Sequence, residues 1–336
     1  MTANMRLIQY RQANGARAIG LVTADGKHAH PLQGFDTVYR LAQASINQKR
    51  PIAELIQAAA ATETVDYLAL LQEGRVLPPV EHPEPARFFL TGTGLTHIGS
   101  ADARNQMHVT THGSNAPESD SMKIFRMGIK DGKPEAGKIG VQPEWFYKGV
   151  GTEIVAPGAP LPLPAYALAG AEEPEIVGLY LVDGDGRPRR IGYTLGNEFS
   201  DHVTEAQNYL YTQHSKLRAC SLGPELLIGE LPADIRGASR IIRDGKVLWE
   251  AEVLSGEANM SHSIANLEHF HFRYRMFRRP GDLHAYFMGA AVLSYAAGVK
   301  TQPGDTFEID VPAFGQPLRN RMELESDEGL VTVSPL

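Results

Sequence analysis

Residues 173–200 read EPEIVGLYLVDGDGRPRRIGYTLGNEFS and carry both a hairpin signal and a group of acidic side chains. The apolar runs 176–182 and 190–195 flank the sequence Asp-Gly-Asp-Gly at 183–186. Asp-Gly pairs between two such runs are typical of β-hairpin turns. We therefore predict two strands joined at this turn.

The pattern of short apolar runs and tight turns continues through the later part of the chain. Asp244-Gly245 and Phe314-Gly315 each separate two further strand candidates. Helical periodicity is expected at 203–216 and 263–274. Such spacing favours a curved sheet. We predict an α+β fold whose main part is a mainly antiparallel β-roll, forming a catalytic domain over 87–336.

The first part of the chain has a different pattern. Strands are expected at 6–10 and 17–22, followed by helices at 37–46 and 52–71. Four prolines then fall between positions 78 and 85, where they restrict the backbone to a linker or an extended edge. We predict a small N-terminal α/β domain over 1–82.

Composition limits the classes of function. The chain has 336 residues with 32 Lys and Arg against 39 Asp and Glu, a net charge of −7, which argues against nucleic-acid or membrane binding. Its single cysteine, Cys220, excludes an intrachain disulfide, and its first residues lack the apolar core of a secretory signal. The longest apolar run, 287–299, is too short to span a bilayer. We expect a cytoplasmic protein.

The acidic residues of the opening stretch are the main candidates for chemistry. Residues two apart on a strand share a face, so Glu173 and Glu175 place two carboxylates side by side. Like charges so close are unfavourable unless a cation or a proton relieves them. Glu198 adds a third carboxylate, and oxygen ligands of this kind favour a hard divalent cation over zinc. The alternative is a solvated acidic surface turn.

The order of several motifs resembles the fumarylacetoacetate hydrolase superfamily, and most closely its dehydratases of 2-keto-3-deoxy sugar acids. The shared features are an acid-x-acid strand, a Gly-Asn-acid-x-Ser turn, a lysine before a Gly-Pro turn, and a closing Pro-Gly-Asp segment. In this chain they lie at Glu173–Glu175, Gly196–Ser200, Lys216 with Gly223-Pro224, and Pro303–Asp305; PEWFYKG at 143–149 and Leu318–Asn320 also match the superfamily. The similarity covers roughly residues 87–325.

The resemblance implies a site and a cofactor. Glu173, Glu175 and Glu198 would bind Mg²⁺, with Mn²⁺ or Ca²⁺ as alternatives, while Lys216 and Glu144 would act as base and acid. Relatives usually have Asp where this chain has Glu198. Many also carry Thr-Gly-Thr where this chain has Met-Gly-Ala-Ala at 288–291, so a threonine contact to the substrate is missing there. Without the resemblance, Lys216 would be a cation at a helix C-terminus and Glu144 a surface residue.

The other site candidates lie in loops that border the active site in relatives. His97 is the candidate for activating water, and residues 100–118 could form a mobile lid. His108 and His112, in the same segment, lack the flanking ligands of a metal site. The residues expected to contact substrate are Gly94, Arg104, Lys148, Asn259, Ser261 and Gly289.

The resemblance implies a metal-dependent lyase of pentose breakdown that removes water from a 2-keto-3-deoxypentonate through an enolate. Lys216 can take a proton only if its pKa is lowered, because a free lysine is protonated at neutral pH. The first alternative is a hydrolase that cleaves a C–C bond of a 2,4-diketo acid, with water positioned by His97. The second is a non-catalytic protein that keeps the fold. By resemblance we expect a homodimer.

Overall fold

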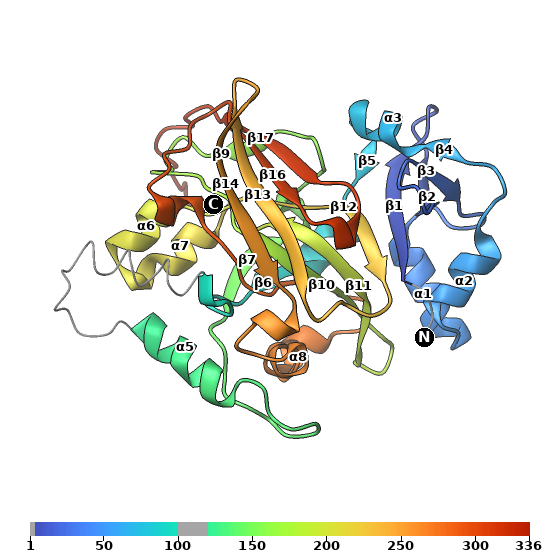
Figure 1. Ribbon diagram of the computed structural model, residues 1–336, viewed down its shortest axis with the longest axis horizontal. Helices are drawn as coiled ribbons and strands as arrows, with labels where there is room; N and C mark the ends of the chain where they lie inside the picture. Colours follow the sequence, from blue (N-terminus) through green and yellow to red (C-terminus); the bar gives the residue numbers. More distant parts are fainter. Residues whose placement is uncertain (1–3, 100–119) are drawn as a thin grey trace.

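The computed structural model describes residues 4–99 and 120–336. Two β-sheets form the framework of this part of the chain, with helices at their ends and edges (Figure 1). The larger sheet has twelve described strands in the order β4-β3-β2-β1-β12-β11-β10-β15-β6-β7, with β5 beside β1 and β8 beside β12. The smaller has five described strands in the order β14-β13-β16-β17-β9.

The elements have the following bounds. The larger sheet contains β1 (Met5–Arg11), β2 (Arg17–Val22), β3 (His28–Pro31), β4 (Val65–Asp66), β5 (Val76–Leu77), β6 (Phe88–Gly92), β7 (Phe146–Val150), β8 (Ile154–Val155), β10 (Pro174–Val182), β11 (Pro188–Asn197), β12 (Cys220–Ile228) and β15 (Leu283–Phe287). The smaller sheet contains β9 (Leu161–Leu163), β13 (Ile235–Arg243), β14 (Lys246–Ser255), β16 (Thr306–Asp310) and β17 (Leu318–Leu324). The α-helices described are α1 (Val38–Gln48), α2 (Ile52–Ala59), α3 (Tyr67–Gln72), α5 (Asp120–Asp131), α6 (His202–Gln207), α7 (Thr212–Lys216) and α8 (Ile264–Phe272).

The predicted fold class is confirmed. Most strand pairs are antiparallel, and the three predicted hairpins are β10–β11, β13–β14 and β16–β17. Parallel pairing occurs between β15 and β6, β12 and β8, and β17 and β9. None of the helices in the described ranges combines the length and hydrophobicity needed to cross a bilayer.

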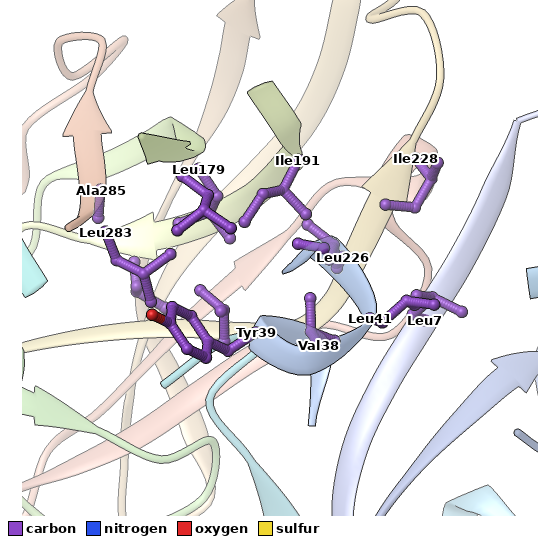
Figure 2. Close-up of a cluster of buried hydrophobic side chains, with 14 of the residues drawn as sticks. Leu7, Val38, Tyr39, Leu41, Leu179, Ile191, Leu226, Ile228, Leu283 and Ala285 are labelled. Atoms are coloured by element: carbon purple, nitrogen blue, oxygen red, sulfur yellow. The ribbon is translucent and has the colours of Figure 1, made fainter. Parts of the chain in front are cut away.

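The N-terminal elements share a sheet and a core with the rest of the chain. β1 pairs with β12, where Leu7 lies opposite Leu226. Val38 and Leu41 of α1 point into the same buried cluster, toward side chains of the larger sheet (Figure 2). Burying these side chains fixes α1 against the roll. The boundary between domains 1–82 and 87–336 remains a prediction.

The helix predicted at 203–216 is wrong in its continuity. α6 ends at Gln207, the next residue, Asn208, has an extended backbone with φ −162°, and α7 begins at Thr212 after a short 3₁₀ turn. Asparagine has a low helix propensity, because its side chain competes for backbone hydrogen bonds. The break gives Lys216 a position at the end of a separate short helix.

The helix predicted at 52–71 is also wrong in its continuity. It divides into α2 and α3, with β4 between them. Val65 and Thr64 are β-branched and favour extended backbone, and β4 pairs with β3. The helix α5 was not predicted from the sequence.

Candidate active site

The β10–β11 hairpin brings the three predicted carboxylates together. Glu175 lies opposite Gly196 in the strand register, and the backbone N–H of Glu198 donates to the carbonyl oxygen of Glu173 at 2.9 Å. One carboxylate oxygen from each of Glu173, Glu175 and Glu198 lies within 4.8 Å of the other two. All three side chains are buried. Antiparallel pairing therefore converts a wide sequence separation into one acidic cluster.

Two buried lysines neutralise part of this charge. Lys216, at the end of α7, donates to Glu173 and, at 2.8 Å, to Oε2 of Glu198. Its Nζ also lies 4.9 Å from the centre of the Phe146 ring. Lys148, on β7, lies 3.0 Å from Oε1 of Glu198. Glu198 thus binds two ammonium groups, one with each oxygen.

The environment separates the pKa values of the three carboxyl groups. Burial raises the pKa of Glu175 well above its ordinary value, and the charges of Glu198 and Glu173 raise it further. Burial and Glu173 also raise the pKa of Glu198, against the opposing effect of the two lysines. For Glu173, burial is outweighed by Lys216 and His202, which together hold the pKa well below its ordinary value. Glu175 is thus the carboxyl that most lacks a compensating positive charge.

Lys216 does not have the lowered pKa that a base requires. Burial acts to lower its pKa, but Glu173 and Glu198 reverse this effect and raise the pKa above that of a free lysine. In this arrangement Lys216 is a protonated partner of the carboxylates. Taking a proton would require an additional positive charge close to it.

The carboxyl group of Glu144 packs against Gly94. A Cβ atom on Gly94 would lie 2.6 Å from Oε2 of Glu144, so a side chain at position 94 would displace this carboxyl group. The hydroxyl of Thr93 donates to the carbonyl oxygen of Glu144 at 2.6 Å and fixes the same contact. Glu144 is therefore buried against the loop that follows β6.

His97 is buried, with its ring nitrogens 2.9 Å from the hydroxyls of Thr96 and Ser255. Burial lowers the pKa of His97 to about 4, so the imidazole is neutral at pH 7. Its role as a water-activating base remains a prediction.

The remaining substrate candidates differ in their surroundings. The N–H of Gly289 donates to Oε2 of Glu175 at 2.7 Å, which places this loop at the cluster. Ser261 is buried and donates its N–H to the carbonyl oxygen of Thr96 at 2.7 Å. The amide of Asn259 is already used by Asp234 and by a backbone carbonyl.

Arg104, His108, His112 and the lid predicted at 100–118 lie outside the described residues.

A second group of side chains surrounds the cluster and was not predicted from the sequence. Nε2 of His202 lies 3.0 Å from Oε1 of Glu173, and Tyr295 stacks on His202 with the ring centres 5.2 Å apart. Glu173, His202 and Glu205 also form a buried group whose ligand atoms lie within 4.8 Å of one another. The signal in the sequence was the position of His202 and Glu205, which both follow Glu198 within two helical turns.

Comparisons with known proteins agree with this geometry. A scan against models of protein families finds no match. The chain is 32% identical over 114 residues to a probable 2-keto-3-deoxyxylonate dehydratase of Haloferax volcanii, a match that covers 32% of this chain and 38% of the relative. It is 25% identical over 199 residues to the 2-dehydro-3-deoxy-D-arabinonate dehydratase of Saccharolobus solfataricus, covering 56% and 58%. These matches thus span between about two fifths and three fifths of the curated relatives.

A solved structure covers nearly the whole fold. A 2-keto-3-deoxy-D-arabinonate dehydratase complexed with magnesium and 2,5-dioxopentanoate aligns with a TM-score of 0.68 at 18% identity, over 96% of this chain and 99% of that one. At this identity the likeness shows the fold. Together with the two sequence relatives, it confirms the predicted resemblance: the chain is similar to 2-keto-3-deoxypentonate dehydratases of the fumarylacetoacetate hydrolase superfamily.

Proposed function

We propose that this chain is a divalent-metal-dependent dehydratase that removes water from a 2-keto-3-deoxypentonate. The observation that carries the proposal is the convergence of Glu173, Glu175 and Glu198 beside Lys216. A solvated acidic turn, the alternative reading of these residues, does not fit their burial. The named relatives act on substrates of this class, which supports the choice of a pentonate.

The three carboxylates fit a hard cation. Their donors are all oxygen, as Mg²⁺, Mn²⁺ and Ca²⁺ prefer, and Mg²⁺ is the metal in the named structural neighbour. Oε1 of Glu175 is buried and has no hydrogen-bond partner within the described part of the chain, so it is available as a ligand. A bound dication would polarise the keto group of the substrate and, by its charge, lower the pKa of Lys216.

The side chains of this protein would then divide the proton transfers. Lys216, once neutral, would take the C3 proton of the substrate, because it lies at the carboxylates and is shielded from water. Glu144 would give a proton to the C4 hydroxyl as the C4–O bond breaks. The C4 hydroxyl would leave as water with the proton of Glu144, while the C3 proton stays on Lys216. A proton passed from Lys216 to Glu144 would then restore both groups.

We further propose substrate contacts at the carboxylate end of the site. Ala290 and Ala291 follow Gly289 and are buried, and their backbone N–H groups donate to no protein acceptor in the described ranges. Buried N–H groups without partners are rare in folded proteins. These two donors, with Gly94 in the adjoining loop, would take the place of the missing threonine contact.

A mass measurement of the products tests the activity. The protein is incubated with Mg²⁺ or Mn²⁺ and a 2-keto-3-deoxypentonate. A product lighter by one water supports the dehydratase, whereas no change in mass contradicts it. A second incubation with a 2,4-diketo acid tests the alternative reaction, because C–C cleavage with release of pyruvate would identify a hydrolase.

We also propose that the protein is a homodimer of the cytoplasm. The edge strand β14 exposes Val247, Leu248 and Leu254, which a partner chain could cover. The lone, buried Cys220 agrees with a reducing compartment. Light scattering of the purified chain at micromolar concentration tests the dimer, and a monomer mass contradicts it.

A further inference from the structure

The loop that follows β15 is attached to the acidic cluster at its first residue. The N–H of Gly289 donates to Glu175, and the hydroxyl of Thr96 donates to the carbonyl oxygen of Met288 at 2.5 Å. Gly289 has φ +94°, and a Cβ atom there would lie 2.0 Å from the Thr96 hydroxyl. These hydrogen bonds therefore fix this end of the loop, and position 289 admits no side chain.

The other end of the loop is attached to Glu172. Oε1 of Glu172 accepts the backbone N–H of Ser294 at 2.9 Å, and Oε2 accepts the hydroxyl of Ser294 at 2.7 Å. The Glu172 side chain is fully buried. Both carboxylate oxygens are thus used to hold a single residue.

The backbone of Glu172 belongs to the same ladder as the candidate metal ligands. Its neighbour Ala171 exchanges two backbone hydrogen bonds with Ser200, each 3.0 Å, and the carbonyl oxygen of Glu173 accepts the N–H of Glu198. A shift of the 294 end of the loop would therefore have to break contacts to a segment that is itself fixed by the site.

The two attachments lie on either side of Ala290 and Ala291, whose N–H groups have no acceptor among the residues that the structure describes. From this arrangement we propose that Glu172 is a positioning residue: it holds residues 289–294 at the distance from the carboxylates that substrate binding requires. The inference rests on the proposed function for its substrate, but the attachment of the loop to Glu172 is measurable without any substrate.

Three variants weaken the attachment by different amounts. Glu172→Ala removes both acceptors, whereas Glu172→Gln keeps one carbonyl oxygen and the shape of the side chain. Ser294→Ala removes the hydroxyl bond and leaves the backbone bond. We expect KM for the pentonate to rise about tenfold in Glu172→Ala and less in the other two, with a smaller change in kcat, because the loop contributes binding and not proton transfer.

Glu225→Gln is the matched control. Glu225 is also a buried glutamate that accepts a backbone N–H, from Gln316 at 2.8 Å. It lies on β12, and its other partners, Tyr67 and Arg6, belong to the N-terminal elements. It therefore reports the general cost of altering a buried carboxylate. KM and the behaviour of the 289–294 loop should remain those of the unchanged protein.

Hydrogen–deuterium exchange of a peptide covering residues 288–297 gives the decisive measurement. Glu172→Ala should accelerate exchange in this peptide about tenfold while distant peptides keep their rates, because local opening frees the Ser294 N–H. If Glu172→Ala does not fold, Glu172→Gln and Ser294→Ala should still accelerate it. Unchanged exchange in the folded variants, or unchanged KM with faster exchange, would overturn the inference. Absence of turnover in the unchanged protein would instead refute the proposed function, and the exchange rates would still decide the role of Glu172.

Discussion

The ammonium group of Lys148 lies 3.0 Å from Oε1 of Glu198, and neither side chain reaches solvent. The same ammonium donates to the carbonyl oxygens of Phe199 at 2.7 Å and Lys216 at 3.0 Å. One lysine thus joins β7 to a candidate metal ligand and to the backbone of the candidate base. It acts on the site through other residues, which is a different role from the direct substrate contact expected of it.

Replacing Lys148 with Met should therefore destabilise the protein strongly. The change leaves Glu198 buried with one counter-charge fewer and two carbonyl groups without a donor. Breaking a buried ion pair in this way costs about 3–5 kcal/mol of unfolding free energy. Urea unfolding of Lys148→Met measures the loss.

The exposed pair Lys123–Asp120 supplies the comparison, with exposed side-chain fractions of 57% and 77%. Lys123→Met should change the unfolding free energy by less than about 1 kcal/mol. Equal effects of the two substitutions would show that Lys148 has no special structural role.

Lys216→Met should abolish turnover and increase the response of stability to a cation. Without Lys216, Glu173 and Glu198 lose the positive charge that they share, so the metal-free protein becomes less stable. A dication would then supply the missing charge. Thermal unfolding with and without Mg²⁺ should show a larger Mg²⁺-induced rise in Tm for the variant than for the unchanged protein.

Two results would contradict this account of Lys216. Turnover at the original rate would remove the residue from the mechanism. An equal Mg²⁺-induced rise in Tm would show that the lysine and the cation do not share the carboxylates.

Stability should decrease as the pH falls from about 6.5 to about 4. Burial lowers the pKa of both His97 and His284 to about 4, against about 6.5 in an unfolded chain. In this window the unfolded state binds protons that the folded state does not, so acid favours unfolding. Each histidine contributes up to roughly 3 kcal/mol to the decrease.

Urea unfolding at pH 7, 6 and 5 measures this effect. His284→Asn should make the decrease shallower, whereas His269→Asn, at an exposed position, should leave its slope unchanged. The same slope in all three proteins would contradict the assignment of a buried neutral imidazole at 284.

The sequence predicted the parts of the site that depend on local pattern. Asp-Gly turns and apolar runs identified the β10–β11 hairpin, and this hairpin is what brings Glu175 and Glu198 together. The helix at 203–216 was wrong, because the extended backbone at Asn208 interrupts it. A single asparagine is a weak signal in an otherwise helical pattern.

Contacts that depend on the order of strands could not be predicted. Glu172 holds Ser294 only because β10 lies beside β15. Lys148 on β7 contacts Glu198 although three strands separate β7 from β11 in the order of the sheet. The contacts of Glu198 also suggest a physical reason for Glu at this position, where relatives usually have Asp. The longer side chain contacts Lys148 and Lys216 at once, one with each oxygen.

The central claim is that Glu173, Glu175 and Glu198 hold one divalent cation, and calorimetric titration with Mg²⁺ tests it most directly. Glu175→Gln is the informative variant, because it keeps the size of the side chain and removes the charge that has least compensation. Glu225→Gln again serves as the control. The account predicts one Mg²⁺ per chain in the unchanged protein and in Glu225→Gln, and an affinity lower by at least about 100-fold in Glu175→Gln. Equal affinity in all three proteins, or no binding in the unchanged protein, would contradict it.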